Sequence, residues 1–176
     1  MDVLTSENVV LRKFETGDIE RFVDAIRESE NSVGSWLPWW KTNYDREDAA
    51  LWFRCCDEKI AAGSAFDIGI FDKKTGLLLG SVAINGIDAA NRIGSLGYWV
   101  RESQQGNGYC TEAVRRISEF GFGDLGLSRL EIVVLVDNIA SRRVAEKCGA
   151  RLECIAENRI MYQGQPSAAA VYSLLL

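Results

Sequence analysis

The stretch Gln105-Gly106-Asn107-Gly108-Tyr109-Cys110-Thr111 constrains the fold of this chain more than any other segment. The apolar run 96–100 before it predicts a β-strand, and residues 111–122 after it predict an amphipathic helix. Glycine lets the main chain approach a ligand closely, and the first N–H groups of a helix have no intrahelical partner. A plain tight turn is the alternative, but the loop carries no acidic side chain. We therefore expect a site for an anion such as phosphate or pyrophosphate.

The composition is typical of one globular domain spanning residues 1–176. A chain of 176 residues is long enough to bury a real core. Apolar residues make up 47% of it and charged residues 26%, as in an ordinary globular protein. The net charge of −5 gives no electrostatic basis for binding nucleic acid, and no apolar run is long enough to span a membrane. The segment 1–7 lacks a signal-peptide pattern, and the five cysteines include no C-x-x-C pair. These features predict reduced thiols in a cytoplasmic protein.

The chain contains no histidine, which removes several classes of catalytic site. Ser-His-Asp and Cys-His nucleophile systems, H-E-x-x-H zinc sites and a histidine general base are all excluded. Any chemistry must therefore use carboxylates, hydroxyls, thiols, amines, main-chain dipoles or bound water, and we expect no metal.

Strand-like and helix-like runs follow one another along the chain. Strands are expected at 9–14, 66–71, 77–85, 92–100, 129–136, 151–157 and 168–176. Helices are expected at 18–29, 46–62, 111–122 and 139–148. This order, with a hairpin early on and helices between later strands, predicts a mixed α/β sheet covered by helices.

A second polar group follows the strongest strand, 129–136, at the start of the next helix. Asn138 and Ser141 are three residues apart, so both can face the same end of that helix. An ordinary N-cap explains Asp137 or Asn138, but it explains Ser141 less well. If strands 96–100 and 131–136 are neighbours, these side chains line the same crevice as the glycine loop. Such a crevice fits a ligand with a pyrophosphate and an amide-bearing arm.

These motifs resemble those of the GNAT acyltransferase superfamily. Gln105-x-x-Gly108-x-Cys110 is similar to its Q/R-x-x-G-x-G/A motif, and Asn138-x-x-Ser141 is similar to its N-x-x-S segment. Further segments resemble the RimJ/RimL-type ribosomal-protein N-acetyltransferases, and the similarity covers nearly the whole chain. They include Ser35-Trp36-Leu37-Pro38-Trp39, Gly97-Tyr98-Trp99-Val100 and Glu157-Asn158-Arg159-Ile160. The resemblance implies the GNAT fold, a mixed and mostly antiparallel sheet of about seven strands flanked by four helices.

The resemblance also implies acetyl-CoA as a cosubstrate whose acetyl group passes directly to an amine. Main-chain groups of Trp99, Val100 and Arg101 would hold the pantetheine arm and the thioester. Amides from Gly106 to Thr111 would bind the pyrophosphate. The expected acetyl-CoA contacts are Trp99, Val100, Arg101, Gln105, Gly106, Asn107, Gly108, Tyr109, Cys110, Thr111, Asn138 and Ser141.

Within this set, the resemblance assigns separate roles to the two polar residues of the second motif. Asn138 would contact the pantetheine, and Ser141 would protonate the leaving thiolate. Arg142 or Arg143 would reach the nucleotide phosphates, although a solvated helix face explains these arginines equally well. The family also implies a homodimer.

The general base is the open point of this interpretation. Relatives often carry His-Asp where this chain has Ser167-Ala168, and some place a glutamate at the position of Ile160. Other carboxylates are candidates, although most carboxylates at such places are simply solvated. These candidates are Glu157, Asp67, Asp88 and Glu153.

The missing base bears on the acceptor amine. An α-amine has a pKa of roughly 7.7–8.0 and a lysine about 10.4, so the α-amine needs less help to become neutral. We therefore expect the N-terminal α-amine of a protein, such as a ribosomal protein, as the acceptor. A small-molecule amine acetyltransferase and a non-catalytic CoA-binding module are the alternatives. Trp36, Trp39 and Trp40 either wall the acceptor groove or pack in the core or at a dimer contact.

Overall fold

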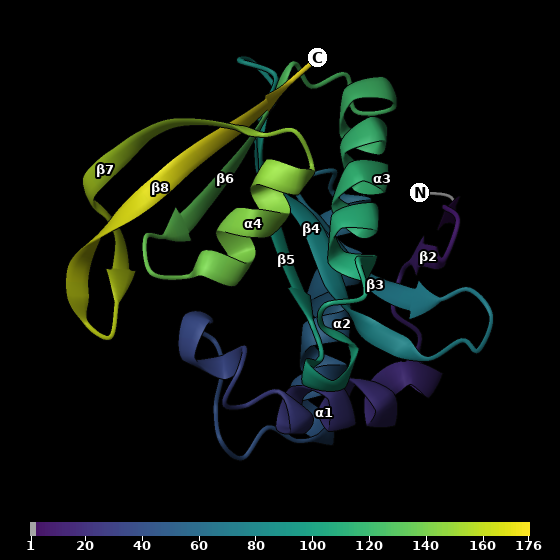
Figure 1. The fold of residues 1–176 in the computed structure, drawn as a ribbon. Helices are drawn as coiled ribbons and strands as arrows, with labels where there is room; N and C mark the ends of the chain where they lie inside the picture. The colour runs from purple at the N-terminus through teal and green to yellow at the C-terminus, as the bar shows by residue number, and fades with distance from the viewer. Residues whose placement is uncertain (1–2) are drawn as a thin grey trace.

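The chain folds around one eight-stranded sheet in the order β1-β2-β3-β4-β5-β6-β8-β7, flanked by four α-helices (Figure 1). The computed structural model describes residues 3–176, so Met1 and Asp2 of the N-terminal segment lie outside the described part. The strands are β1 (Leu4–Thr5), β2 (Val9–Arg12), β3 (Phe66–Asp72), β4 (Leu78–Asp88), β5 (Ile93–Val100), β6 (Arg129–Leu135), β7 (Arg151–Tyr162) and β8 (Gln165–Leu175). The helices are α1 (Ile19–Glu28), α2 (Arg46–Ala61), α3 (Tyr109–Gly123) and α4 (Ile139–Lys147), with short 3-10 helices at Thr16–Asp18, Gly34–Trp36 and Glu102–Gln104. Within residues 3–176, no helix is both long and apolar enough to cross a bilayer.

The expected mixed α/β sheet with four helices is confirmed, and every predicted strand and helix is present. The eighth strand, β1, has two residues, which is too short to leave a pattern in the sequence. The hairpin of β7 and β8 is longer than expected on both sides of its turn. Most side chains of β7 are exposed, so this strand lacks the alternation of apolar and polar residues that burial imposes. Main-chain pairing, such as Tyr162 with Gln165, carries the extension instead.

Two hydrophobic cores hold the sheet between its helices. Alternate residues of β3, such as Ile68 and Ile70, pack in the first core with α3. The apolar face of α3, expected from its amphipathic pattern, is buried there and consists of Ala113, Val114, Ile117 and Phe120. The second core lies against α1 and α2 and includes Phe71 and Trp99. The two cores therefore cover opposite faces of the central strands.

Among the described strands, β5 and β6 are the one neighbouring pair that runs parallel. They pair over three positions, from Ile93 with Arg129 to Ser95 with Glu131. Beyond Ser95, β5 stays paired with β4 up to Val100, while β6 stays paired with β8 up to Leu135. The two strands consequently spread apart toward their carboxyl ends, with α4 close to the opening (Figure 1).

An ion pair ties α1 to the segment that follows β5. Arg101 Nε donates to the Glu28 carboxylate over 3.0 Å, and a second guanidinium nitrogen contacts the same oxygen. The backbone N–H of Ser103 donates to the other Glu28 oxygen over 2.8 Å. These bonds, the one from Arg101 above all, hold the pKa of Glu28 at about 2. The link positions the residues that lead into the glycine loop.

We expect this ion pair to make stability depend on pH below about 4.5. Because the pKa of Glu28 is lower in the folded chain, its contribution is full above the unfolded pKa and is lost as the pH falls toward about 2. Glu28→Gln should lower the free energy of unfolding at pH 7, and the deficit should shrink between pH 5 and pH 3. Urea unfolding at several pH values measures the difference.

Asp24→Asn is the matched control, because Asp24 is an exposed carboxylate on the same helix. It should leave the free energy of unfolding nearly unchanged at each pH. A Glu28→Gln deficit that stays constant down to pH 3 would contradict the role of the ion pair.

Candidate active site

The opening between β5 and β6 forms a cavity of about 480 Å³. It is bounded by the amino ends of α3 and α4, which follow these two strands, and by the 3-10 helix Gly34–Trp36. Ligands bind at the carboxyl ends of strands in many open α/β sheets, which is where this cavity lies. Of the residues predicted for the site, the walls include Trp36, Trp99, Val100, Gln105, Gly106, Gly108, Tyr109, Cys110, Thr111, Asn138 and Ser141. Among the predicted acetyl-CoA contacts and the three tryptophans, those that do not line it are Arg101, Asn107, Trp39 and Trp40.

The glycine loop has the conformation of an anion-binding turn. Gly106 and Gly108 have φ angles of 80° and 84°, which residues with a side chain adopt only at a cost. In the described part of the chain, none of the N–H groups of residues 106–111 has a hydrogen-bond acceptor. The first bonded amide is that of Glu112, which donates to the Gly108 carbonyl oxygen over 3.0 Å. Consecutive free donors at the positive end of α3 are suited to a bound diphosphate.

The edge of β5 that faces the opening also presents free main-chain groups. The N–H of Arg101 donates to the Leu79 carbonyl oxygen over 2.8 Å, so the peptide groups of Arg101 face β4. Because successive residues of a strand face opposite edges, those of Val100 face the opening. The Gln105 side chain donates to the Val100 carbonyl oxygen over 3.1 Å, which agrees with this orientation. The Val100 N–H is thereby directed into the cavity.

The start of α4 brings Ser141 into contact with β5. Asn138 caps the helix, since its Oδ1 accepts the Ser141 N–H over 3.1 Å. The Ser141 hydroxyl donates to the Tyr98 hydroxyl oxygen over 3.2 Å, and the Tyr98 hydroxyl donates to the Ser141 carbonyl oxygen over 2.9 Å. No role was predicted for Tyr98 from the sequence. A hydroxyl within an apolar strand, two residues before Val100, is the signal in the sequence that could have identified it.

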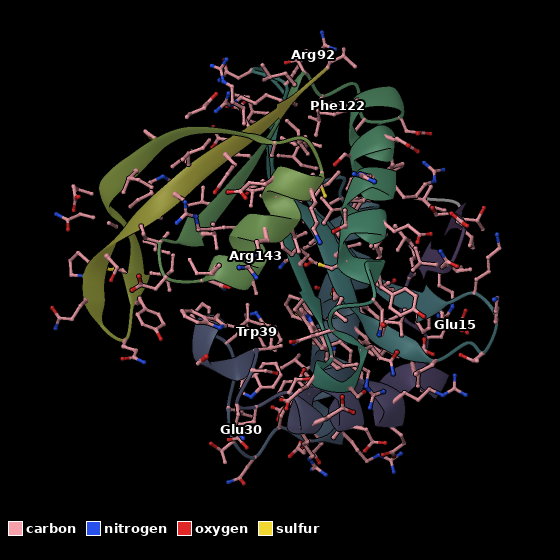
Figure 2. The ribbon with its side chains drawn as sticks, in the orientation of Figure 1. Glu15, Glu30, Trp39, Arg92, Phe122 and Arg143 are labelled. Carbon is pink, nitrogen blue, oxygen red and sulfur yellow. The ribbon has the colours of Figure 1, made fainter. Side chains whose placement is uncertain are left out.

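The charged residues of the cavity walls are basic. Arg143, which projects from α4, and Lys147 line the cavity (Figure 2). Arg142 faces elsewhere, because it donates to the Tyr172 hydroxyl over 3.0 Å and to the Val136 carbonyl oxygen over 3.1 Å. Asn107 lies in an adjoining groove of about 630 Å³ that also contacts Lys147. The cationic groups are therefore placed near the glycine loop.

None of the four candidate carboxylates lines the cavity in the described part of the chain. The Arg129 guanidinium holds the pKa of Glu153 at about 2, and hydrogen bonds from Asn91 lower the pKa of Asp88. Asp67 is buried, and burial raises its pKa, but it lies on β3 outside the cavity. Glu157 is exposed on β7. The side chain of β7 that lines the cavity is Ile160, which is apolar.

The tryptophan-rich segment is divided between the cavity and the second core. Trp36 lines the cavity and stacks on Tyr162 of β7, with ring centroids 6.2 Å apart. Trp40 packs edge-on against Trp99 in the second core. Trp39 is 42% exposed, stacks on Trp52 of α2 and does not line the cavity. Of the three predicted acceptor contacts, the structure brings Trp36 alone to the cavity.

Comparison with known proteins gives the same family from sequence and from structure. A family model described as the acetyltransferase (GNAT) domain matches residues 8–151. YdaF of Bacillus subtilis, provisionally named as a ribosomal N-acetyltransferase, is 29% identical over 97% of this chain and 92% of its own length. A Vibrio cholerae structure, provisionally described as a ribosomal-protein-serine acetyltransferase, is 32% identical, covers 99% of this chain and 98% of its own, and has a TM-score of 0.88. The microcin C7 self-immunity acetyltransferase MccE, solved with acetyl-CoA and AMP, shares the fold at 23% identity over 97% of this chain and 94% of its own, with a TM-score of 0.89.

Proposed function

Because the chain belongs to the GNAT acetyltransferase family and is of the RimJ/RimL type, we propose that it acetylates the N-terminal α-amine of a protein. The family makes the chain an N-acetyltransferase with acetyl-CoA as its cosubstrate, as the sequence indicated. One observation carries the proposed choice of acceptor: in the described part of the chain, no carboxylate lines the cavity. The names of YdaF and of the Vibrio cholerae protein favour a ribosomal protein as the acceptor.

The residues of the cavity fit acetyl-CoA along its length. The free amides of residues 106–111 would hold the pyrophosphate, with Arg143 and Lys147 supplying positive charge nearby. The opened edge of β5 would pair with the pantetheine amides, as a neighbouring strand would. Asn138 uses its side-chain oxygen as a helix cap, which leaves its NH₂ group to donate to the pantetheine. The thioester would then lie between Val100 and Ser141.

The proposed reaction is a direct attack of the amine on the thioester. The nitrogen lone pair forms the new C–N bond, and the carbonyl π electrons move to oxygen, where the Val100 N–H stabilises the charge. Collapse of this intermediate breaks the C–S bond and leaves the electron pair on sulfur. The Ser141 hydroxyl donates a hydrogen bond to the departing thiolate, while water takes the proton that the nitrogen loses and supplies the proton that later converts the thiolate to the thiol. The chain thus contributes positioning and hydrogen-bond donors.

The acceptor end of the cavity favours an amine that is already largely neutral. The walls there include Val33, Trp36, Leu37 and Ile160, which offer no charge to a cation. A lysine or a polyamine would have to lose its proton in this apolar surrounding without a base. An α-amine is partly neutral near pH 7, because its pKa is roughly 7.7–8.0. An apolar, base-free acceptor end therefore selects for the α-amine.

We expect Gly108→Ala to weaken acetyl-CoA binding by about tenfold or more, because the loop must keep its left-handed backbone to present its amides. Titration calorimetry with acetyl-CoA measures the change. Gly126→Ala is a matched control, since Gly126 also has a positive φ of 65° and open space around it, but lies in the turn after α3. Both variants should lose similar stability. Equal losses of affinity would show that the loop conformation does not matter for binding.

We expect Ser141→Ala to lower kcat by about 10- to 100-fold and to change the KM for acetyl-CoA by less than about threefold, because the donor acts on the departing sulfur. Ser118→Ala is the control, since Ser118 is buried on α3 and donates to the Val114 carbonyl oxygen. An unchanged kcat in Ser141→Ala would make Ser141 a residue of the helix start alone.

The acceptor class is tested with a panel of amines. Peptides with a free N-terminus and no lysine should release CoA faster than N-terminally blocked peptides with internal lysines, and faster than spermidine. Intact-mass analysis of ribosomal proteins incubated with the enzyme should show the addition of one acetyl group, and peptide mapping should place it on the N-terminal residue. Faster reaction of internal lysines would refute the α-amine proposal, and faster reaction of spermidine would favour a small-molecule enzyme.

A further inference from the structure

Tyr98 and Ser141 form two hydrogen bonds with each other in the wall of the cavity. Tyr98 lies on the part of β5 that has separated from β6, and Ser141 lies in the first turn of α4. The tyrosine hydroxyl donates to the Ser141 carbonyl oxygen over 2.9 Å, and the Ser141 hydroxyl donates to the tyrosine oxygen over 3.2 Å. One phenol therefore contacts both oxygens of the residue proposed to act on the leaving sulfur.

The two hydroxyls of Tyr98 and Ser141 can donate one hydrogen bond each, which limits the bonds that they can form at one time. Each hydroxyl has one proton to donate. Here the Ser141 hydroxyl donates to the Tyr98 oxygen, and the Tyr98 hydroxyl donates to the Ser141 carbonyl oxygen. When negative charge develops on sulfur, the thiolate becomes a stronger acceptor than a neutral phenol oxygen. The Ser141 proton then turns toward sulfur, and a lone pair of its Oγ turns toward Tyr98. The Tyr98 hydroxyl can then rotate and donate to that lone pair instead of to the carbonyl oxygen. No covalent bond is broken in this change of acceptor.

We propose that Tyr98 is a positioning residue that orients the Ser141 hydroxyl and donates to it while Ser141 donates to the thiolate. The inference rests on the proposed function of Ser141. It requires a short chain of donors from Tyr98 through Ser141 to sulfur, in which each bond polarises and strengthens the next. This series of hydrogen bonds forms fully only when the sulfur is charged. It therefore stabilises the departing thiolate more than the bound thioester.

The surroundings of Tyr98 suit this role. Its ring packs against the first hydrophobic core, so the phenol has a fixed position. Burial raises the pKa of Tyr98, and the side chain therefore keeps its proton and remains a donor at neutral pH. The backbone bond to Ser141 also fixes the start of α4 relative to β5. Tyr98 thus controls both the place of Ser141 and the direction of its hydroxyl.

The thiol pKa of bound CoA tests the proposal without any acceptor amine. CoA labelled with ¹³C at the carbon next to sulfur reports thiolate formation by its chemical shift as the pH is raised, separately from the protein's cysteines. Ser141→Ala should raise this pKa by on the order of one unit, because it removes a hydrogen bond to a charged acceptor. Tyr98→Phe should raise it by about half as much. In the Ser141→Ala background, Tyr98→Phe should change nothing further.

Tyr172→Phe is the matched control, because the Tyr172 hydroxyl also bonds α4, through Arg142 and Glu146, but does not contact Ser141. It should leave the thiol pKa unchanged. The inference is overturned if Tyr98→Phe has no effect, if it has the same effect without Ser141, or if Tyr172→Phe matches it. If Ser141→Ala itself leaves the thiol pKa unchanged, the proposed role of Ser141 fails, and the inference fails with it.

A second variant covers the case in which Tyr98→Phe does not fold. Replacement of Tyr98 by 3-fluorotyrosine keeps the shape and the hydroxyl but makes the phenol a stronger donor. The thiol pKa of bound CoA should then fall relative to the unmodified enzyme. An unchanged or raised thiol pKa would overturn the inference.

Discussion

The site depends on the early end of pairing between β5 and β6. Three paired positions join the two halves of the sheet. Beyond these positions, β5 and β6 are no longer hydrogen-bonded to each other. Each strand keeps its partner on the other side, β4 or β8, so the separation costs no pairing there. The gap exposes main-chain donors and acceptors that a continuous sheet would have used. It also brings the amino ends of α3 and α4 to the same opening, where both helices begin.

A site built in this way needs little from ionisable side chains. The groups directed into the cavity are main-chain amides, neutral hydroxyls and two cations near the glycine loop. A chain without histidine can supply such groups, because amides and hydroxyls keep their protons throughout the neutral range. In the proposed reaction, positioning and oriented dipoles take the place of a strong base. The proposed acceptor, an α-amine that is already partly neutral near pH 7, would need no strong base.

The sequence predicted the parts of the structure that leave a local pattern. The glycine loop, the cap at Asn138 and the buried face of α3 follow from turn chemistry and helical periodicity, and the structure has all three. The fate of the tryptophans was not predictable, because Trp36, Trp39 and Trp40 have the same chemistry and differ only in what the fold places beside them. The contact between Tyr98 and Ser141 joins residues 43 positions apart, and no spacing rule reaches that far. Tertiary packing decides such pairs.

The last strand of the sheet, β7, is long and exposed, and its outer edge pairs with no other strand of residues 3–176. Exposed apolar residues such as Ile155 and Met161 make a long edge of this kind a template for unwanted strand addition. The backbone at Asn158 interrupts it, since its φ of 51° coincides with the register shift between Ala156 and Ile160. An incoming strand cannot form a continuous ladder across this break. The irregularity therefore guards the protein against edge-to-edge aggregation, and a regularised β7 would lose that protection.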